Sequence, residues 1–211
     1  MNDKNYWEKY YSLQNAELKP SLFARFINDT VISTQKSIIE LGCGNGRDAI
    51  FFANEGFDVI AVDQIYSEIK FLKNRYIQLK NCSFECADFT NLDNSRKFDI
   101  VYSRFTLHSI TETQENKVIW WAFLNLNPNG KFCIEVRGQK NEIFGKGTPV
   151  KNQPNAFIYD DHHRRFINLD VLVNKLKEAG FMIDFAAEEK GFAPFNGADE
   201  TFIRVIATKK N

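Results

Sequence analysis

A run of glycines between two acidic residues carries the clearest sign of chemistry in this sequence. The run from Glu40 to Gly46 reads Glu-Leu-Gly-Cys-Gly-Asn-Gly, and Asp63 stands at the end of the next apolar segment. Glycine at every second position permits a tight turn and removes the Cβ atoms that would collide with a bound ligand. A carboxylate at the end of the following strand can accept both hydroxyls of a ribose. The spacing therefore predicts a nucleotide-type ligand between the glycine run and Asp63.

A dinucleotide-binding loop would use the same physics, so the positions of the glycines have to separate the two cases. The dinucleotide fingerprint is G-x-G-x-x-G, with a diphosphate facing the start of a helix. In this sequence the third glycine, Gly46, comes early, and Arg47 stands where the fingerprint has glycine. Glu40 also lies just before the first glycine. A carboxylate in that position suits a cationic ligand better than a diphosphate.

Alternating apolar segments and amphipathic helices are expected to position these residues. We expect strands at 37–41, 57–63, 82–86, 98–103 and 131–136, and helices at 48–53, 67–79, 111–126 and from Asn168 or Asp170 to Ala179. Such alternation implies right-handed crossovers and a mostly parallel sheet with helices on both faces. The last two segments, 181–185 and 201–208, are predicted to form an antiparallel pair at its edge. The predicted fold class is α/β, with one Rossmann-like domain around a seven-stranded sheet.

Two segments lie outside this alternation. Residues 137–167 contain several glycines and prolines, and an insertion of this length between a strand and a helix is typical of a functional loop. Residues 1–36 are predicted to form an N-terminal helical cap on the main domain, residues 37–211. The cap holds aromatic residues at helical spacing, which suit either a pocket lining or an ordinary core helix: Trp7, Tyr10, Tyr11, Phe23 and Phe26.

Five short motifs follow one another along the chain. The first is Ile38 to Gly46, the second is Asp63, and the third is Ala87-Asp88-Phe89. The fourth is the predicted strand and its lead-in at 97–103, and the fifth is the turn at 126–131. In this order they resemble the motifs of class I S-adenosylmethionine-dependent methyltransferases. The fifth departs from the family's L-x-P-G-G pattern by an asparagine, which tolerates a left-handed turn.

The resemblance implies S-adenosylmethionine as cofactor, S-adenosylhomocysteine as its product, and methyl transfer as the reaction. In this family the acid after the second strand binds the ribose, and the acid of the third motif meets the adenine amino group. The resemblance places these residues in the cofactor site: Glu40, Gly42, Cys43, Gly44, Gly46, Asp63, Gln64, Asp88, Phe89 and Ser103. The alternative is a non-catalytic Rossmann-like protein that binds another nucleotide as the partner of a larger assembly.

The residues after the fourth strand are candidates for the acceptor site, because the methyl group should emerge there. Methyl transfer from a sulfonium is an in-line displacement, and alignment alone supplies about 7–11 kcal/mol of barrier reduction. Arg104 is predicted to bind the acceptor, and His108 is a candidate catalytic base or donor, since imidazole titrates near neutral pH. An equally simple interpretation is that His108 caps the next helix or packs beside the sheet.

The run Asp160-Asp161-His162-His163-Arg164-Arg165 is the densest polar cluster in the chain. Adjacent histidines in a loop rarely converge on one metal ion without further ligands, so we expect no metal. His162 and His163 are candidate catalytic residues. Arg164 and Arg165 are candidate acceptor ligands, because arginine grips phosphate or carboxylate groups through two hydrogen bonds. A solvated charged turn explains the same run without any ligand.

The sequence resembles small stand-alone bacterial methyltransferases, both the tellurite-resistance type and those that accompany surface-polysaccharide biosynthesis. The stretches 102–110 and 161–166 are more similar to the second group, which implies O-methylation of a sugar or a phosphorylated small acceptor. Tellurite or another small molecule is the alternative acceptor. Methylation of DNA nitrogen is disfavoured, because no Asn-Pro-Pro-aromatic or Asp-Pro-Pro-aromatic motif follows the fourth strand.

The amino-acid composition limits the kinds of partner that this protein is expected to have. Lys and Arg total 27, as do Asp and Glu, so no global positive charge favours nucleic acid. An apolar run of about 18 residues, which a membrane-spanning helix needs, does not occur. The four cysteines form no CxxC pair, and the first residues show no secretory apolar region, so we expect a cytoplasmic protein. We expect a small-molecule acceptor as its partner and a monomer or homodimer as its state.

Overall fold

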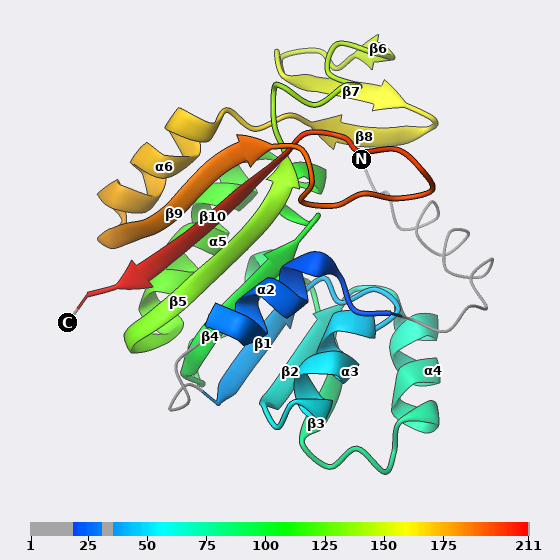
Figure 1. The fold of residues 1–211 in the computed structure, drawn as a ribbon, viewed down its shortest axis with the longest axis vertical. Helices are drawn as coiled ribbons and strands as arrows, with labels where there is room; N and C mark the ends of the chain where they lie inside the picture. The colour runs from blue at the N-terminus through cyan, green and yellow to red at the C-terminus, as the bar shows by residue number, and fades with distance from the viewer. Residues whose placement is uncertain (1–18, 31–35, 211) are drawn as a thin grey trace.

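The computed structural model describes residues 19–30 and 36–210, and the fold is a seven-stranded sheet with helices on both faces (Figure 1). The strand order is β3-β2-β1-β4-β5-β10-β9. The strands are β1 Ser37–Leu41, β2 Asp58–Asp63, β3 Cys82–Cys86, β4 Phe98–Arg104, β5 Leu126–Arg137, β9 Phe181–Glu189 and β10 Phe202–Lys209. The predicted α/β Rossmann-like fold is confirmed, with β1 to β5 parallel and β10 antiparallel to both of its neighbours.

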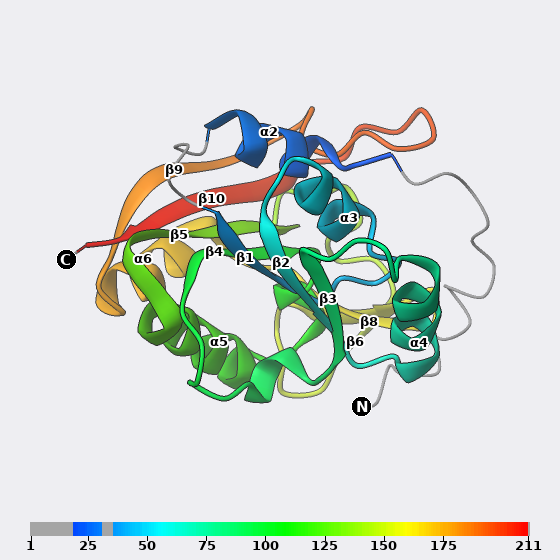
Figure 2. The same cartoon turned by 90° about the horizontal axis from the view of Figure 1, so that it is seen from below.

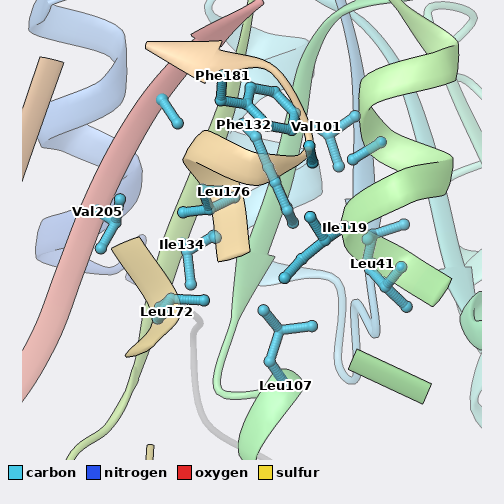
Figure 3. Packing of buried hydrophobic residues seen from close by; sticks show 14 of the residues in the cluster. Leu41, Val101, Leu107, Ile119, Phe132, Ile134, Leu172, Leu176, Phe181 and Val205 are labelled. Atoms are coloured by element: carbon cyan, nitrogen blue, oxygen red, sulfur yellow. The ribbon is translucent and has the colours of Figure 1, made fainter. Parts of the chain in front are cut away.

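The helices divide into two layers, which Figure 2 shows on opposite sides of the sheet. They are α2 Leu22–Thr30, α3 Arg47–Asn54, α4 Tyr66–Arg75, α5 Glu112–Asn125 and α6 Leu169–Glu178, with 3-10 turns η1 Phe89–Asn91 and η2 Leu107–Ser109. One buried cluster joins α5 and α6 to the sheet through side chains such as Ile119 and Leu172 (Figure 3). A second cluster joins α2, α3 and α4 to the other face. Because helices pack on both faces of the sheet, the positions of the strand ends next to the site are fixed.

Most element boundaries follow local sequence signals. Thr111 caps α5, accepting from the Gln114 backbone at 3.3 Å, while the Gln114 side chain accepts from the Thr111 backbone at 3.0 Å. Helix α4 ends at Arg75, before the predicted residue 79, because the chain turns there with Leu79 N–H bonded to the Tyr76 carbonyl. Asn129 has the left-handed φ of 63° expected for its turn, although that turn lies within β5.

The segment predicted as an inserted loop contains a small sheet, beyond the carboxyl end of β5 in Figure 1. Its strands are β6 Thr148–Pro149, β7 Ala156–Tyr159 and β8 His162–Arg165, which pair antiparallel. Asp160 and Asp161 form the turn between β7 and β8 with φ of 52° and 56°. Two successive left-handed residues twist a hairpin in the favoured sense, and Asp tolerates that conformation. The charged turn is therefore solvated at its two acids, whereas the two histidines that follow are buried.

The predicted N-terminal cap is described only in part. Trp7, Tyr10 and Tyr11 lie outside the described residues. Phe23 is fully buried within the α3 side of the core, and Phe26 packs against that cluster. A boundary at residue 37 between cap and main domain stays a prediction. Within the described ranges, no helix is both long enough and apolar enough to cross a membrane.

Candidate cofactor and acceptor site

The glycine loop, residues 42–46, joins β1 to α3 and lies against the end of β2. The backbone N–H groups of Gly42 and Cys43 donate to the Val62 carbonyl at 2.8 and 2.9 Å. Gly42 has a φ of +72°, and a Cβ there would lie 2.4 Å from Thr106 Cγ2. Both facts require glycine, since an L-residue would strain the turn and collide with the threonine. The loop thus presents bare backbone at the carboxyl edge of the sheet, as predicted.

Asp63 and the glycine loop form one hydrogen-bonded unit. Oδ2 of Asp63 accepts from the Gly44 backbone at 2.9 Å, and Oδ1 accepts from the Ile65 backbone at 2.9 Å. Burial raises the pKa of Asp63, while the bonds from Ile65 and Gly44 oppose that rise. The carboxylate is therefore held in one orientation, with lone pairs left to accept from a ligand. Gln64, the next residue, is exposed at the same edge.

Glu40 lies buried beneath the loop with only 5% of its surface exposed. Among the described residues its Oε2 atom has no hydrogen-bond partner. Burial raises the pKa of Glu40 well above its usual range, Asp48 adds to that rise, and the positive charge of Arg47 opposes it. A buried carboxylate oxygen without a partner is costly, so Oε2 is a candidate acceptor for a donor on a bound ligand.

Asp88 and Phe89 follow β3 at the same edge of the sheet. Oδ1 of Asp88 accepts from the Thr90 backbone at 2.9 Å and from the Thr90 hydroxyl at 2.8 Å, which fixes η1. Phe89 borders the glycine loop: its ring edge lies 3.7 Å from where a Cβ on Gly42 would stand. The exposed carboxylate of Asp88 and the ring of Phe89 stay the predicted contacts of adenine.

Ser103 and Arg104 end β4, but neither side chain is freely presented. Ser103 is fully buried, and its hydroxyl lies 2.6 Å from the hydroxyl of Thr106, the residue whose methyl group packs on Gly42. Nε of Arg104 donates to the buried carboxylate of Glu135 at 2.9 Å, and its guanidinium stacks 4.0 Å from the Phe105 ring. Ser103 therefore supports the loop through Thr106, and Arg104 is anchored to the sheet.

His108 is buried in η2, where its Nδ1 accepts from the Arg137 backbone at 3.3 Å. Burial is the main cause that lowers the pKa of His108 well below its usual range, and nearby basic side chains add to it: Arg137, His162, Arg164 and Arg165. The imidazole is consequently neutral at physiological pH. Since Nδ1 accepts, the proton of the neutral ring lies on Nε2. This geometry favours His108 as a hydrogen-bond donor over a general base.

The remaining histidines alternate along β8 and therefore point to opposite faces of the small sheet. Burial, followed by the charge on Arg164, lowers the pKa of His162 to about 3. On the other face, Nε2 of His163 lies 3.0 Å from the side-chain oxygen of Gln153. His162 is therefore close enough to His108 to affect its pKa. His163 instead contacts Gln153, in the turn that precedes β7. Catalytic roles for both histidines stay predictions.

The two arginines of β8 also differ in their surroundings. Arg164 donates to the Tyr159 carbonyl and lies 5.5 Å from the Tyr159 ring centre, at the end of the hairpin. Nε and Nη2 of Arg165 donate to the carbonyls of Ile110 and Leu107 at 3.0 and 2.9 Å. These contacts favour Arg165 as a structural residue and leave Arg164 as the better candidate for an acceptor. We use the name basic cluster for His108, Arg137, His162, Arg164 and Arg165.

Sequence reasoning did not single out a buried polar network that fixes α2 beside the glycine loop. Asp48, in the first turn of α3, accepts from the Ser21 backbone and hydroxyl at 2.7 Å each, and from the Tyr102 hydroxyl at 2.8 Å. The sequence feature that could have revealed this network is Asp48, an acidic residue on the otherwise apolar buried face of α3. Arg137 and Thr106 were also missed, since neither belongs to a motif. In the described ranges, no group of three or more His, Cys, Asp or Glu side chains could hold a metal.

Comparison with known proteins decides the family. The sequence profile of a family described as a methyltransferase domain matches residues 32–163. The chain belongs to this methyltransferase family. This membership supports the methyl transfer that the sequence resemblance predicted over the non-catalytic nucleotide-binding protein that the sequence left open.

Its relatives include methyltransferase 235L of Invertebrate iridescent virus 6, with 30% identity over 51% of this chain and 40% of that protein. Phosphoethanolamine N-methyltransferase 1 of Arabidopsis thaliana is 31% identical over 78% of this chain and 32% of the plant protein. The chain thus spans less than half the length of either relative. The tellurite-resistance and polysaccharide groups are not among the relatives compared.

Solved structures share the fold. A SAM-dependent methyltransferase from Methanosarcina mazei superposes with a TM-score of 0.75 at 18% identity, over 88% of this chain and 97% of that one. The glycopeptide N-methyltransferase MtfA complexed with S-adenosyl-L-methionine gives 0.69 at 18% identity, over 93% of this chain and 90% of the other. At such low identity these likenesses show the fold alone.

Proposed function

We propose that the chain methylates a small phosphorylated acceptor, held by the basic cluster next to the cofactor. One observation carries the proposal: Arg137, Arg164 and Arg165 all act electrostatically on the buried side chain of His108, and two of them have carboxylate partners, Arg137 in Glu200 and Arg165 in Glu115. A basic side chain beside a neutral hydrogen-bond donor suits an anionic group on the acceptor. Phosphate suits it best, because arginine binds phosphate with charge-assisted hydrogen bonds.

On the cofactor side, we assign the ammonium group of S-adenosylmethionine to Oε2 of Glu40, which has no partner among the described residues. Asp63 would accept from the ribose hydroxyls, and Asp88 and Phe89 would meet the adenine ring. Gly42 lets the loop take this conformation, because a Cβ there would collide with Thr106. The bound cofactor supplies the activated methyl group, so the protein has to align the acceptor and exclude water.

On the acceptor side, Arg164 would bind the phosphate, and His108 would donate from Nε2 to an acceptor oxygen. The named activity of the plant relatives, phosphoethanolamine N-methylation, supports a phosphorylated acceptor and makes nitrogen a candidate methylation site beside oxygen. We retain O-methylation of a sugar or phosphorylated metabolite as the other form of the same proposal. Both place an anion on the basic cluster and the nucleophile toward the methyl group.

An assay for S-adenosylhomocysteine release tests the proposal directly. The panel consists of phosphoethanolamine, sugar phosphates and nucleotide sugars, each paired with its unphosphorylated counterpart, and tellurite as a separate arm. We expect turnover with at least one phosphorylated compound and much less with its counterpart. Turnover of the counterparts at equal kcat/KM, or of tellurite alone, would contradict the proposal.

A further inference from the structure

Arg165 connects the small sheet to the short segment that carries His108. Its guanidinium lies 3.0 Å from the Ile110 carbonyl through Nε and 2.9 Å from the Leu107 carbonyl through Nη2. Leu107 begins the 3-10 turn and Ile110 follows its last residue, so the two carbonyls stand on either side of His108 along the chain. One side chain from β8 therefore closes both ends of the His108 segment.

Glu115 holds that arginine in place. Its Oε2 accepts from Arg165 Nη2, and its Oε1 accepts from Lys175 Nζ at 2.9 Å. Glu115 is 1% exposed, and the Arg165 side chain 11% exposed, so little water competes for either group. A fork-shaped guanidinium can bind a carboxylate and two carbonyls at once, which the ammonium of lysine cannot do in the same geometry. The pair comes from α5 and β8, elements distant in sequence.

Glu112 offers a natural comparison on the same helix. It accepts from the same Lys175 ammonium at 2.6 Å, yet its side chain is 63% exposed and it has no bond to Arg165. Against the lowering effect of burial, the hydrogen bonds to Glu112 and Glu115 raise the pKa of Lys175. Only Glu115 thus links the ion pair to the His108 segment.

We propose that Glu115 and Arg165 are positioning residues that set the place of His108 in the acceptor site. Removing one partner of a buried ion pair leaves the other charge uncompensated, and the structure relaxes to hydrate it. If Glu115 is neutralised, Arg165 moves toward water and releases the Leu107 and Ile110 carbonyls. His108 then loses its fixed orientation and its burial. The link to the acceptor rests on the function proposed above, but the positioning itself does not.

Histidine NMR of the full chain tests this without any acceptor. The chain has three histidines, so the ring signals of His108 can be assigned by comparison with single histidine variants. In Glu115→Gln, we expect the pKa of His108 to move up toward its ordinary value. We also expect the amide hydrogens of residues 108–110 to exchange about tenfold faster, equivalent to about 1.4 kcal/mol. Glu112→Gln is the matched control and should leave both readouts unchanged.

Two further measurements separate positioning from general damage. Calorimetric titration with S-adenosylhomocysteine should give Kd values within about threefold of each other for wild type and both glutamate variants, since a factor of three is under 1 kcal/mol. If Glu115→Gln does not fold, Arg165→Lys keeps the positive charge and is expected to give the same His108 response. Unchanged His108 titration and amide exchange in a folded Glu115→Gln or Arg165→Lys variant would overturn the positioning proposal. Failure of every phosphorylated acceptor would overturn the proposed function and leave the positioning intact.

Discussion

The cofactor edge and the basic cluster are built in different ways. The cofactor edge consists largely of backbone: the N–H groups of the glycine loop donate to the Val62 carbonyl and to the Asp63 carboxylate. The basic cluster consists of side chains from η2, β5 and β8, whose positions depend on tertiary contacts. A backbone site is encoded by a short motif with glycines at fixed spacing, whereas a side-chain site depends on residues that only folding brings together.

The two regions also differ in their charged side chains. Glu40, Asp63 and Asp88 mark the cofactor edge, whereas in the basic cluster Arg137 pairs with Glu200, Arg165 pairs with Glu115, and Arg164 is the proposed ligand of an anion. The chain as a whole has no net formal charge, so composition conceals this division. A cationic sulfonium cofactor and an anionic acceptor match the two halves in sign. Substitutions can alter the cofactor edge or the basic cluster alone, and the following tests use this.

The largest expected effect is on the backbone half. Gly42→Ala places a Cβ 2.4 Å from Thr106 Cγ2 at a φ of +72°, so the loop or Thr106 must shift. Left-handed strain and overpacking each cost about 1–3 kcal/mol, and we expect S-adenosylhomocysteine affinity to fall about 100-fold by calorimetry. Gly56→Ala is the control, since its φ is +91° with nothing within 4 Å of a new Cβ. Equal affinity loss in both variants would show that the collision is irrelevant.

Glu40→Gln tests the charge of the cofactor half. We expect affinity for S-adenosylmethionine to fall about tenfold, because a charge-assisted hydrogen bond is worth about 1.5–3 kcal/mol. The free energy of unfolding should respond to Glu40→Gln in the opposite sense. The folded-state pKa of Glu40 is raised, so its ionisation above that pKa costs stability, and glutamine removes the cost. Urea unfolding at pH 8 should therefore show no loss of stability; a less stable variant with normal affinity would contradict the assignment.

Arg164→Gln alters only the basic half. With a phosphorylated acceptor from the panel, we expect KM to rise about tenfold, from loss of one charge-assisted contact, while cofactor affinity stays unchanged. Lys151→Gln, an exposed residue of the same insertion, is the control and should change neither quantity. Steady-state kinetics and calorimetry measure the two effects separately. A fall in cofactor affinity with an unchanged KM would reverse the assignment of the two halves.

The last expected effect concerns stability rather than binding, as a pH dependence of the free energy of unfolding. The pKa of His162 is lowered to about 3 in the fold, so the unfolded chain binds its proton first as the pH falls. The contribution of neutral His162 is present above about pH 6.5 and is lost from there down to about pH 3, at up to about 1.4 kcal/mol per pH unit. His162→Asn should lose this slope and match the wild-type slope above pH 7.5. Parallel stability curves for the two proteins down to pH 4 would contradict the shift.

The sequence was sufficient to predict the glycine loop and the strand that ends at Asp63, because each of these features is local. Glycine spacing, Asp63 and the alternation of strands and helices all have short-range signals, and the left-handed conformation of Asn129 follows from its turn. The hairpin at Asp160-Asp161 also had a local signal, two turn-forming acids after apolar residues, but the glycines and prolines around it favoured a loop.

The acceptor side could not be predicted at the same level. The contact of Arg165 with Glu115 and the bond from the Arg137 backbone to His108 join residues far apart in the chain. The protonation of His108 follows from that bond and from burial, neither of which a single sequence displays. The fold brings His162 and Arg164 close enough to His108 to lower its pKa, and the catalytic and acceptor-binding roles of the three residues stay predictions.

The most direct measurement compares a phosphorylated acceptor with its unphosphorylated counterpart in wild type and in Arg164→Gln, by S-adenosylhomocysteine release. The account predicts a strong preference for the phosphorylated compound in wild type, measured as the ratio of kcat/KM values. In Arg164→Gln that ratio should fall about tenfold, because the variant loses the charge-assisted contact with phosphate and no contact with the neutral compound. An unchanged ratio would contradict the claim that the basic cluster recognises the anionic group of the acceptor.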